Sequence, residues 1–263
     1  MDLGIAGKRA LVAAASHGLG KAAAMELARE GARLVICSRD QSAIESAAEE
    51  IRAATSMEVL PVVADVTQIP DIERLADHAM ARFGGVDILV TNAGGPPATT
   101  FSTTPPDAWQ KAFDLTLMSA INLCRALVPQ MRQRQWGRII FISSITVKQP
   151  AGNLLLSNVI RTAISGLSKS LSNEYAADNV LVNSVLPGYT LTERMAELSE
   201  AQAKTRGVST DQVIAEWVQQ IPMRRLGKPE ELAALIAFLA SERASYITGA
   251  AIQVDGGFIK GIY

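Results

Sequence analysis

Short apolar runs recur along the chain between longer segments in which apolar residues repeat at helical spacing. Each run is long enough for one buried strand. The expected strands are residues 9–14, 34–37, 58–63, 86–90, 137–144, 180–185 and 251–254. The expected helices are residues 21–30, 41–54, 69–83, 108–133, 154–177 and 229–239, with two more in 192–220 that separate near Gly207. Such alternation predicts parallel strands joined by crossover helices, an α/β fold with a doubly wound, seven-stranded parallel sheet.

The first strand-helix-strand unit carries the strongest local signal. Its first strand breaks at Ala15-Ser16-His17-Gly18-Leu19-Gly20, a helix follows, and Gly31 ends it before the strand at 34–37. Small residues let the backbone come close to a diphosphate, and the first N–H groups of the helix point at the anion. A plain structural turn would also use glycines, but the complete βαβ unit favours a dinucleotide site.

Nothing divides the chain, because no charge block, low-complexity tract or linker interrupts the pattern. Residues 96–106 are rich in Pro and Thr and are expected to be a loop. The 263 residues can bury one large core, so we expect a single domain spanning residues 1–263.

The composition argues against some classes of binding partner. With 25 basic and 26 acidic residues the formal net charge is -1, which gives no long-range attraction to nucleic acid or to an anionic membrane. No uninterrupted apolar run reaches the length of a bilayer crossing, and residues 1–5 lack the pattern of a secretion signal. Cys37 and Cys124 cannot form a disulfide framework, so a cytoplasmic location is expected. The two histidines are His17 and His78, and without clustered ligands no metal site is expected.

Several motifs coincide along the whole chain. They are Ser16-His17-Gly18-Leu19-Gly20, Asp65-Val66, Asn92-Ala93-Gly94, Ser143-Ser144, Pro187-Gly188, Tyr246-Ile247-Thr248-Gly249 and Val254-Asp255-Gly256-Gly257. In this order they resemble those of the short-chain dehydrogenase/reductase family, most closely its 3-oxoacyl-[acyl-carrier-protein] reductase branch. The resemblance implies a Rossmann-like fold, a nicotinamide dinucleotide cofactor and interconversion of a carbonyl and a secondary alcohol.

The resemblance also implies which residues border the cofactor. They are Ala14, Ser16, His17, Gly18, Leu19, Gly20, Ser38, Arg39, Asp65, Val66, Asn92, Ala93, Gly94, Arg161, Pro187, Gly188, Thr190 and Thr192. The family's glycine motif begins Thr-Gly, whereas this chain has Ala13-Ala14. In one interpretation, the Cβ of Ala14 crowds the tight turn and disfavours a positive φ. In the other, Ala14 simply packs beside its alanine neighbours.

NADP(H) is favoured over NAD(H) by the residues after the second strand. An acidic residue there would bind the ribose hydroxyls and repel a 2′-phosphate. This chain has Ser38-Arg39, a hydroxyl followed by a guanidinium suited to forked phosphate contacts, and His17 could add a donor. The alternative is that Arg39 is a solvated charge that pairs with Asp40 or Glu45.

The family's catalytic residues are only partly retained. The resemblance implies an Asn, a Ser, a Tyr that exchanges the proton, and a Lys four residues after the Tyr. Ser144 matches the serine, while the other three positions hold Thr116, Ser157 and Arg161. A serine hydroxyl is far less acidic and shorter than a phenol, and an arginine stays protonated. We therefore expect altered chemistry at this site.

Two residues are candidates to replace the missing acid. Tyr189 follows Pro187-Gly188, where the family's chain passes the nicotinamide, and Lys148 lies four residues beyond Ser144. For each a structural role is the stronger alternative, since Tyr189 could pack under a lid and Lys148 could be a solvated loop charge.

The resemblance further implies a helical lid at about 190–222, with Met195, Leu198 and Trp217 as apolar lining, although such helices often only cover a core. Loop 95–106, with Phe101, would form the opposite rim. Family members pair the helices here at 108–133 and 154–177 with a second copy, which implies a homotetramer or homodimer.

Two functions remain open. One is an NADP(H)-dependent oxidoreductase acting on a 3-oxoacyl thioester or a similar hydrophobic ketone, with Ser144 polarising the carbonyl. The other is a catalytically impaired dinucleotide-binding protein that acts as a sensor or partner subunit. The cofactor motifs support both equally. The replaced catalytic residues favour the binding protein, whereas Ser144, the lid and the C-terminal motifs favour the enzyme, which is the function we expect.

Overall fold

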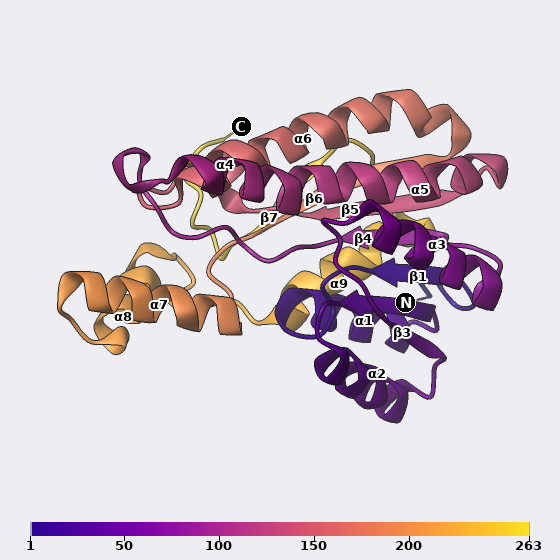
Figure 1. The fold of residues 1–263 in the computed structure, drawn as a ribbon, viewed down its shortest axis with the longest axis horizontal. Coiled ribbons are helices and arrows are strands. Elements are labelled where there is room, and N and C mark those ends of the chain that lie inside the picture. The colour runs from indigo at the N-terminus through magenta and orange to yellow at the C-terminus, as the bar shows by residue number, and fades with distance from the viewer. Residues whose placement is uncertain (1, 263) are drawn as a thin grey trace.

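The computed structural model describes residues 2–262 and contains one seven-stranded parallel sheet (Figure 1). Its strand order is β3-β2-β1-β4-β5-β6-β7. The strands are β1 (Arg9–Val12), β2 (Arg33–Ser38), β3 (Val59–Val63), β4 (Ile88–Thr91), β5 (Gly137–Ile142), β6 (Val180–Pro187) and β7 (Ala251–Val254). The order reverses between β1 and β4, so a crevice opens beyond their carboxyl ends. The predicted α/β fold is confirmed.

Helices cover both faces of the sheet. They are α1 (Gly18–Arg29), α2 (Gln41–Thr55), α3 (Ile69–Phe83), α4 (Pro106–Ala112), α5 (Ser119–Gln133), α6 (Leu155–Tyr175), α7 (Glu193–Arg206), α8 (Thr210–Gln220) and α9 (Pro229–Leu239). One hydrophobic core joins α1, α2 and α9 to the sheet, and another joins α3, α5 and α6 to its other face. Helices α7 and α8 project beyond the sheet at one end (Figure 1).

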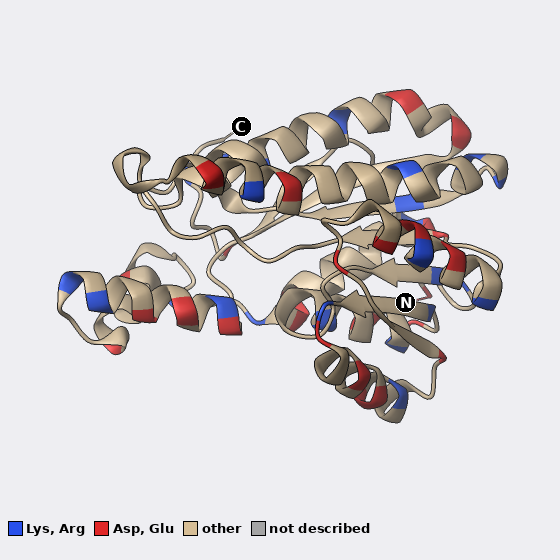
Figure 2. Cartoon of the chain, viewed as in Figure 1, with Lys and Arg blue, Asp and Glu red and all other residues tan. Residues whose placement is uncertain are grey.

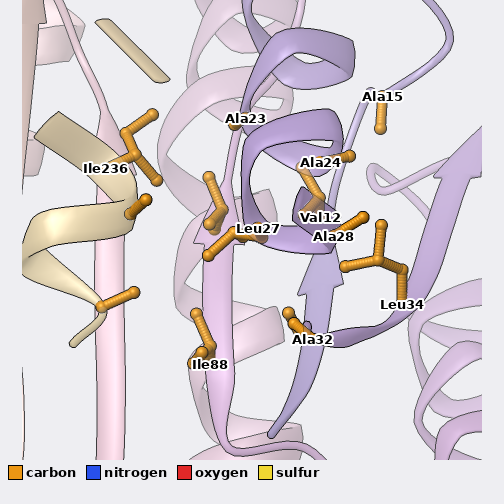
Figure 3. Packing of buried hydrophobic residues seen from close by; sticks show 14 of the residues in the cluster. Val12, Ala15, Ala23, Ala24, Leu27, Ala28, Ala32, Leu34, Ile88 and Ile236 are labelled. Carbon is orange, nitrogen blue, oxygen red and sulfur yellow. The ribbon is translucent and has the colours of Figure 1, made fainter. Parts of the chain in front are cut away.

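Strand β1 shows how the pattern produces two cores. Because side chains alternate across a strand, Ala10 and Val12 enter the first core and Leu11 enters the second. Helix α1 lies close to the sheet, since Ala23, Ala24, Leu27 and Ala28 form its buried face (Figure 3). This close packing brings the amino end of α1 to the carboxyl end of β1.

The predicted helix at 108–133 is interrupted. Between α4 and α5 lies one π-helical segment, η2 (Phe113–Met118), in which each backbone hydrogen bond spans one residue more than in an α-helix. This segment has only six residues, too few for its different hydrophobic period to show in the sequence. Of the residues described, 106–133 form one helical stretch long and apolar enough to cross a membrane, but Leu123, Leu127 and Met131 are packed in the second core.

Two predicted strands end earlier than expected. Residues 9–14 form a strand only to Val12, since Ala14 adopts a positive φ of 48°. Residues 137–144 form a strand only to Ile142, because Ser144 caps the short 3-10 helix η3 (Ile145–Val147). Both changes turn the chain away from the sheet at its carboxyl edge.

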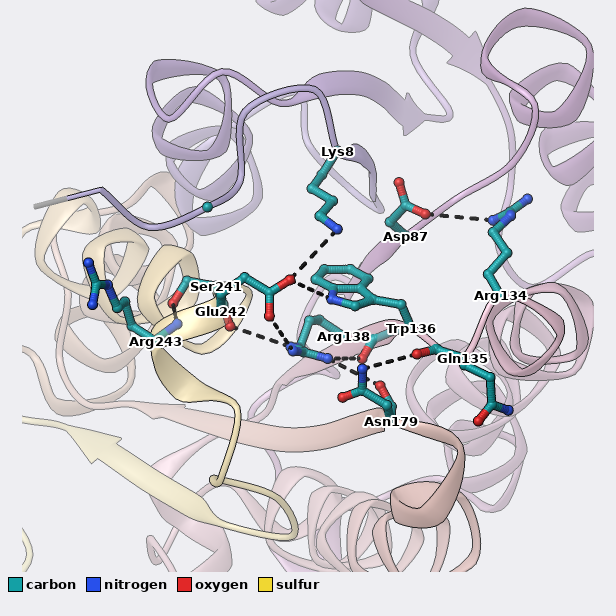
Figure 4. Close-up of polar contacts among 12 residues, drawn as sticks. Lys8, Asp87, Arg134, Gln135, Trp136, Arg138, Asn179, Ser241, Glu242 and Arg243 are labelled. Atoms are coloured by element: carbon teal, nitrogen blue, oxygen red, sulfur yellow. Dashed lines mark hydrogen bonds and ion pairs between the residues drawn. The ribbon is translucent and has the colours of Figure 1, made fainter.

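A polar cluster lies at the opposite end of the strands, near the amino end of β5 (Figure 4). The Arg138 side chain on β5 is 1% exposed, and its guanidinium lies over the Trp136 ring at 4.3 Å. Its Nη2 lies 3.6 Å from the Glu242 carboxylate, which also accepts a hydrogen bond from Trp136 Nε1 at 2.7 Å. Burial lowers the pKa of Arg138, and Glu242 partly offsets this effect. Elsewhere basic and acidic residues are interspersed along the helices (Figure 2).

We expect Glu242→Ala to destabilise the protein, because it leaves the buried Arg138 guanidinium without a counter-ion and Trp136 without an acceptor. The loss should be about 2 kcal/mol in the free energy of unfolding, measured by urea denaturation. Glu49→Ala, an exposed carboxylate on α2, is the matched control. Equal unfolding midpoints for the two variants would contradict this role of Glu242.

Candidate active site

A cavity of about 760 Å³ lies beyond the carboxyl ends of β1, β4, β5 and β6. Its walls come from the segments that follow these strands and from α7, α8 and the C-terminal segment. A crevice at this place is where open parallel sheets bind nucleotides. Its size lies in the range of ligand pockets, about 300–1,000 Å³.

The glycine turn forms one end of this cavity. Ala14, His17, Gly18 and Leu19 line it, and α1 begins at Gly18, whose φ is 54°. At Gly20 a Cβ would lie only 2.3 Å from the Ala14 carbonyl oxygen, so a side chain cannot be accepted there. The turn thus brings backbone N–H groups of a helix start to the cavity, the arrangement that holds a phosphate. Ala14 occupies a left-handed conformation, as the crowding argument implied.

Arg39 lies at the same end and lines the cavity. It makes no ion pair with Asp40 or Glu45, since Asp40 caps α2 by accepting from Ala43 N at 2.9 Å and Glu45 accepts from Gln41. The guanidinium is exposed and available to a ligand. Ser38 does not line the cavity, because its hydroxyl donates to the Asp40 carbonyl oxygen at 2.9 Å.

Most other predicted cofactor residues also reach the cavity. Asn92 lines it and donates to the Ala14 carbonyl oxygen at 3.2 Å, which ties the end of β4 to the turn after β1. The remaining members that line it are Ala93, Gly94, Arg161, Pro187, Gly188, Thr190 and Thr192. Those outside its lining are Ser16, Gly20, Ser38, Asp65 and Val66. Asp65 instead accepts hydrogen bonds from Thr67, and Val66 packs in the second core.

Hydroxyl groups form the other end of the cavity. Ser144 Oγ accepts from Thr146 N at 3.1 Å, which leaves the hydroxyl proton of Ser144 available as a donor. Thr146 Oγ1 and Ser157 Oγ lie 3.3 Å apart. All three residues line the cavity, and Thr146 had no signal in the sequence beyond its closeness to Ser144.

Arg161 lies one helical turn after Ser157 and lines the same wall. Its Nη1 donates to the carbonyl oxygens of Ile142 at 3.1 Å and Ser143 at 2.9 Å. Burial, and secondarily the positive charge of Arg194, lower the pKa of Arg161 to about 10. The structure therefore brings Ser144, Ser157 and Arg161 together, as the motif spacing predicted.

The other candidate catalytic residues are placed differently. Thr116 is buried in η2 outside the cavity lining, and its hydroxyl has no hydrogen-bond partner among the described residues. Lys148 also lies outside the lining, because its Nζ donates to Gln253 Oε1 at 2.7 Å. Tyr189 does line the cavity, and burial raises the pKa of its phenol.

Tyr189 belongs to an aromatic wall. Its ring stacks on Trp217 with centroids 5.0 Å apart and meets Phe258 edge-on at 5.3 Å. Met195 and Leu198 extend this wall along α7. Phe258 could have been suspected only from its place just after Gly256-Gly257.

Helices α7 and α8 separate at Gly207, as predicted, and α7 reaches across the cavity. Arg194 Nη2 donates to the Pro96 carbonyl oxygen at 2.6 Å, and the Thr192 and Glu193 side chains lie over Gly18. The rim at Gly95 and Pro96 was expected. Phe101 was wrongly assigned to it, since this ring is 82% exposed on the 3-10 helix η1 (Phe101–Thr103) and lies outside the lining.

Comparison with known proteins identifies the family. Residues 13–259 match the family model described as enoyl-(acyl carrier protein) reductase. Dehydrogenase/reductase SDR family member 4 of Oryctolagus cuniculus is 37% identical over 254 residues, which are 96% of this chain and 94% of that protein. The chain belongs to the short-chain dehydrogenase/reductase family.

Two further relatives of this short-chain dehydrogenase/reductase have informative names. NADPH-dependent reductase BacG of Bacillus subtilis (strain 168) is 34% identical over 97% of this chain and 99% of that protein. The crystal structure of L-sorbose reductase from Gluconobacter frateurii, complexed with NADPH and L-sorbose, superposes with a TM-score of 0.94 at 36% identity and covers 100% of both chains.

We expect Ala14→Gly to stabilise this short-chain dehydrogenase/reductase. A left-handed conformation costs an L-residue roughly 1–2 kcal/mol, and glycine's extra chain entropy offsets only part of this gain. The net increase in the free energy of unfolding should be about 0.5–1 kcal/mol by urea denaturation. Ala13→Gly, a buried neighbour without positive φ, should lose about 1 kcal/mol. A loss in both variants would show that Ala14 is not strained.

Proposed function

We propose that this protein is an NADP(H)-dependent reductase that converts a ketone to a secondary alcohol. The observation that carries the proposal is that one cavity joins a helix-start phosphate cradle at one end to Ser144, Ser157 and Arg161 at the other. A dinucleotide held at the glycine turn would extend along Asn92, Ala93 and Gly94 toward these side chains.

The preference for a 2′-phosphate is supported by Arg39, whose guanidinium is exposed at the cavity and free of Asp40 and Glu45. A phosphate accepts forked hydrogen bonds from such a group. The names of two relatives, BacG and L-sorbose reductase complexed with NADPH, point the same way.

The proposed reaction is R–CO–R′ + NADPH + H⁺ → R–CHOH–R′ + NADP⁺. When bound, the cofactor supplies a hydride to the carbonyl carbon. The Ser144 hydroxyl donates a hydrogen bond to the carbonyl oxygen, because its own oxygen already accepts from Thr146 N. A positioned donor stabilises the charge that develops on that oxygen.

The proton is proposed to come from water through the hydroxyls of Ser157 and Thr146. Their oxygens lie 3.3 Å apart at the cavity wall beside Ser144. A packing role for Tyr189 is supported by the two aromatic rings that it contacts, Trp217 and Phe258.

We further propose that the substrate has an apolar part. The aromatic and apolar wall on α7 and α8 supports a substrate with an apolar part, and the 3-oxoacyl thioester implied by the resemblance has one. That 190–222 acts as a moving lid, that the protein is a homotetramer or homodimer, and that it works in the cytoplasm are also predictions.

The second candidate is a dinucleotide-binding protein without turnover, a sensor or partner subunit. One observation favours it, since Ser157 stands where the family places its phenol and Tyr189 is held in an aromatic stack. Both candidates bind NADPH, so only turnover separates them.

We expect Arg39→Ala to weaken NADPH binding by about 10–100-fold, because a charge-assisted hydrogen bond to the phosphate is lost. NADH binding should change little, as measured by fluorescence titration of both cofactors. Arg29→Ala, at the far end of α1, is the control for loss of positive charge. Equal changes for NADPH and NADH would remove Arg39 as the phosphate ligand.

Turnover is tested by NADPH oxidation with a panel of ketones, 3-oxoacyl thioesters and oxo acids. We expect activity in the wild type, a loss of about 100-fold in Ser144→Ala, and a change of less than about threefold in Tyr189→Phe. Tight NADPH binding without NADPH oxidation in the presence of any of these substrates would favour the binding protein. A loss in Tyr189→Phe as large as that in Ser144→Ala would make Tyr189 the acid.

A further inference from the structure

Arg161 is a buried cation without an acidic partner. The side chain is 9% exposed, and no carboxylate among the described residues forms an ion pair with it. Two carbonyl oxygens hold its Nη1, but carbonyl dipoles do not neutralise a full charge. A buried charge is costly unless an opposite charge is supplied, and the lowered pKa of Arg161 reports that cost.

One edge of the guanidinium remains free. A guanidinium has five N–H donors, and the two on Nη1 are used by Ile142 and Ser143. Nε and Nη2 make no hydrogen bond to the described residues, and neither is among the fully enclosed unpartnered atoms. Because Arg161 lines the cavity, this edge is open to it. The Nε–Nη2 edge is a fork that matches the two oxygens of a carboxylate.

The other charges near the cavity do not supply the missing partner. Of the acidic residues that line it, Glu197 pairs with Arg194 at 3.2 Å and Glu193 lies over Gly18 at the opposite end. The glycine turn follows β1, which is two strands from β5, so phosphates held there lie roughly 10 Å or more from Arg161's anchoring carbonyls. A ribose hydroxyl, which the resemblance places here, is neutral.

We infer that the free edge of Arg161 binds a carboxylate of the substrate, so that the ketone reduced is an oxo acid. This inference rests on the proposed reduction of a ketone, and it favours an oxo acid over the 3-oxoacyl thioester that the resemblance implies. One of the two carbonyl groups that anchor Arg161 belongs to Ser143, and the next residue, Ser144, is proposed to hold the reacting oxygen. A carboxylate close to the ketone, as in 2-oxo and 3-oxo acids, fits this arrangement.

The aromatic wall then takes the rest of the substrate. Tyr189, Trp217 and Phe258 face the same cavity and offer flat apolar surface. An oxo acid with an aromatic or branched apolar group satisfies both features. The balanced reaction is R–CO–COO⁻ + NADPH + H⁺ → R–CHOH–COO⁻ + NADP⁺ for a 2-oxo acid, with the hydride added to the ketone carbon and the proton to its oxygen.

The test compares phenylpyruvate and 2-oxo-4-methylpentanoate with their methyl esters, which keep the ketone and lack the charge. We expect the wild type to favour each acid by about 10–100-fold in kcat/KM, the contribution of a charge-assisted bidentate hydrogen bond. Arg161→Met should abolish that preference. Thermal unfolding and NADPH titration of the variant show whether the fold and the cofactor site remain intact.

Binding is measured separately by calorimetric titration of phenylpyruvate into the NADP⁺-loaded and cofactor-free protein. We expect phenylpyruvate to bind the wild type. Binding should be lost in Arg161→Met and weakened much less in Arg161→Lys, which keeps the charge.

Wild-type turnover of esters as efficient as that of acids would overturn the inference while the proposed reductase stands. Arg161-dependent binding of phenylpyruvate without any NADPH oxidation would support the carboxylate site and reject the reductase. Absence of both binding and preference for the acid would overturn the inference.

Discussion

The close approach of α1 to the turn after β1 fixes the geometry of the carboxyl edge of the sheet. Gly20 lies against the Ala14 carbonyl oxygen with no room for a Cβ, and Asn92 donates to that same oxygen at 3.2 Å. One backbone group thus joins β1, α1 and β4. Because the small residues of α1 pack tightly on the sheet, the helix start and its N–H groups are held at the cavity.

The two ends of the cavity differ in chemistry. Backbone N–H groups and the exposed Arg39 suit phosphates at one end, while the other end has hydroxyls and a buried guanidinium. A phenol near Ser144 would act as a proton donor, whereas Arg161 is a permanent cation that binds and orients. The proposed loss of the phenol and gain of the guanidinium therefore shift the site from acid catalysis toward recognition of an anion.

Much of this arrangement follows from the sequence, and the parts that do not have physical reasons. The strands and helices α3 and α9 were predictable because burial on a parallel sheet imposes clear hydrophobic periods. The grouping of Ser144, Ser157 and Arg161 followed from motif spacing. The π-helical turn at 113–118 and the pairing of Lys148 with Gln253 were not predictable, because the first depends on a local shift in backbone hydrogen bonding and the second on a contact between distant segments. Neither the Phe258 stack nor the open edge of Arg161 is encoded by local pattern.

The most direct measurement is a crystal structure of the protein with NADP⁺ and phenylpyruvate bound. We expect Nε and Nη2 of Arg161 to donate to the two carboxylate oxygens at about 2.7–2.9 Å, with the ketone oxygen within hydrogen-bonding reach of Ser144. A carboxylate held elsewhere, or an Arg161 edge occupied only by the ribose, would contradict this arrangement.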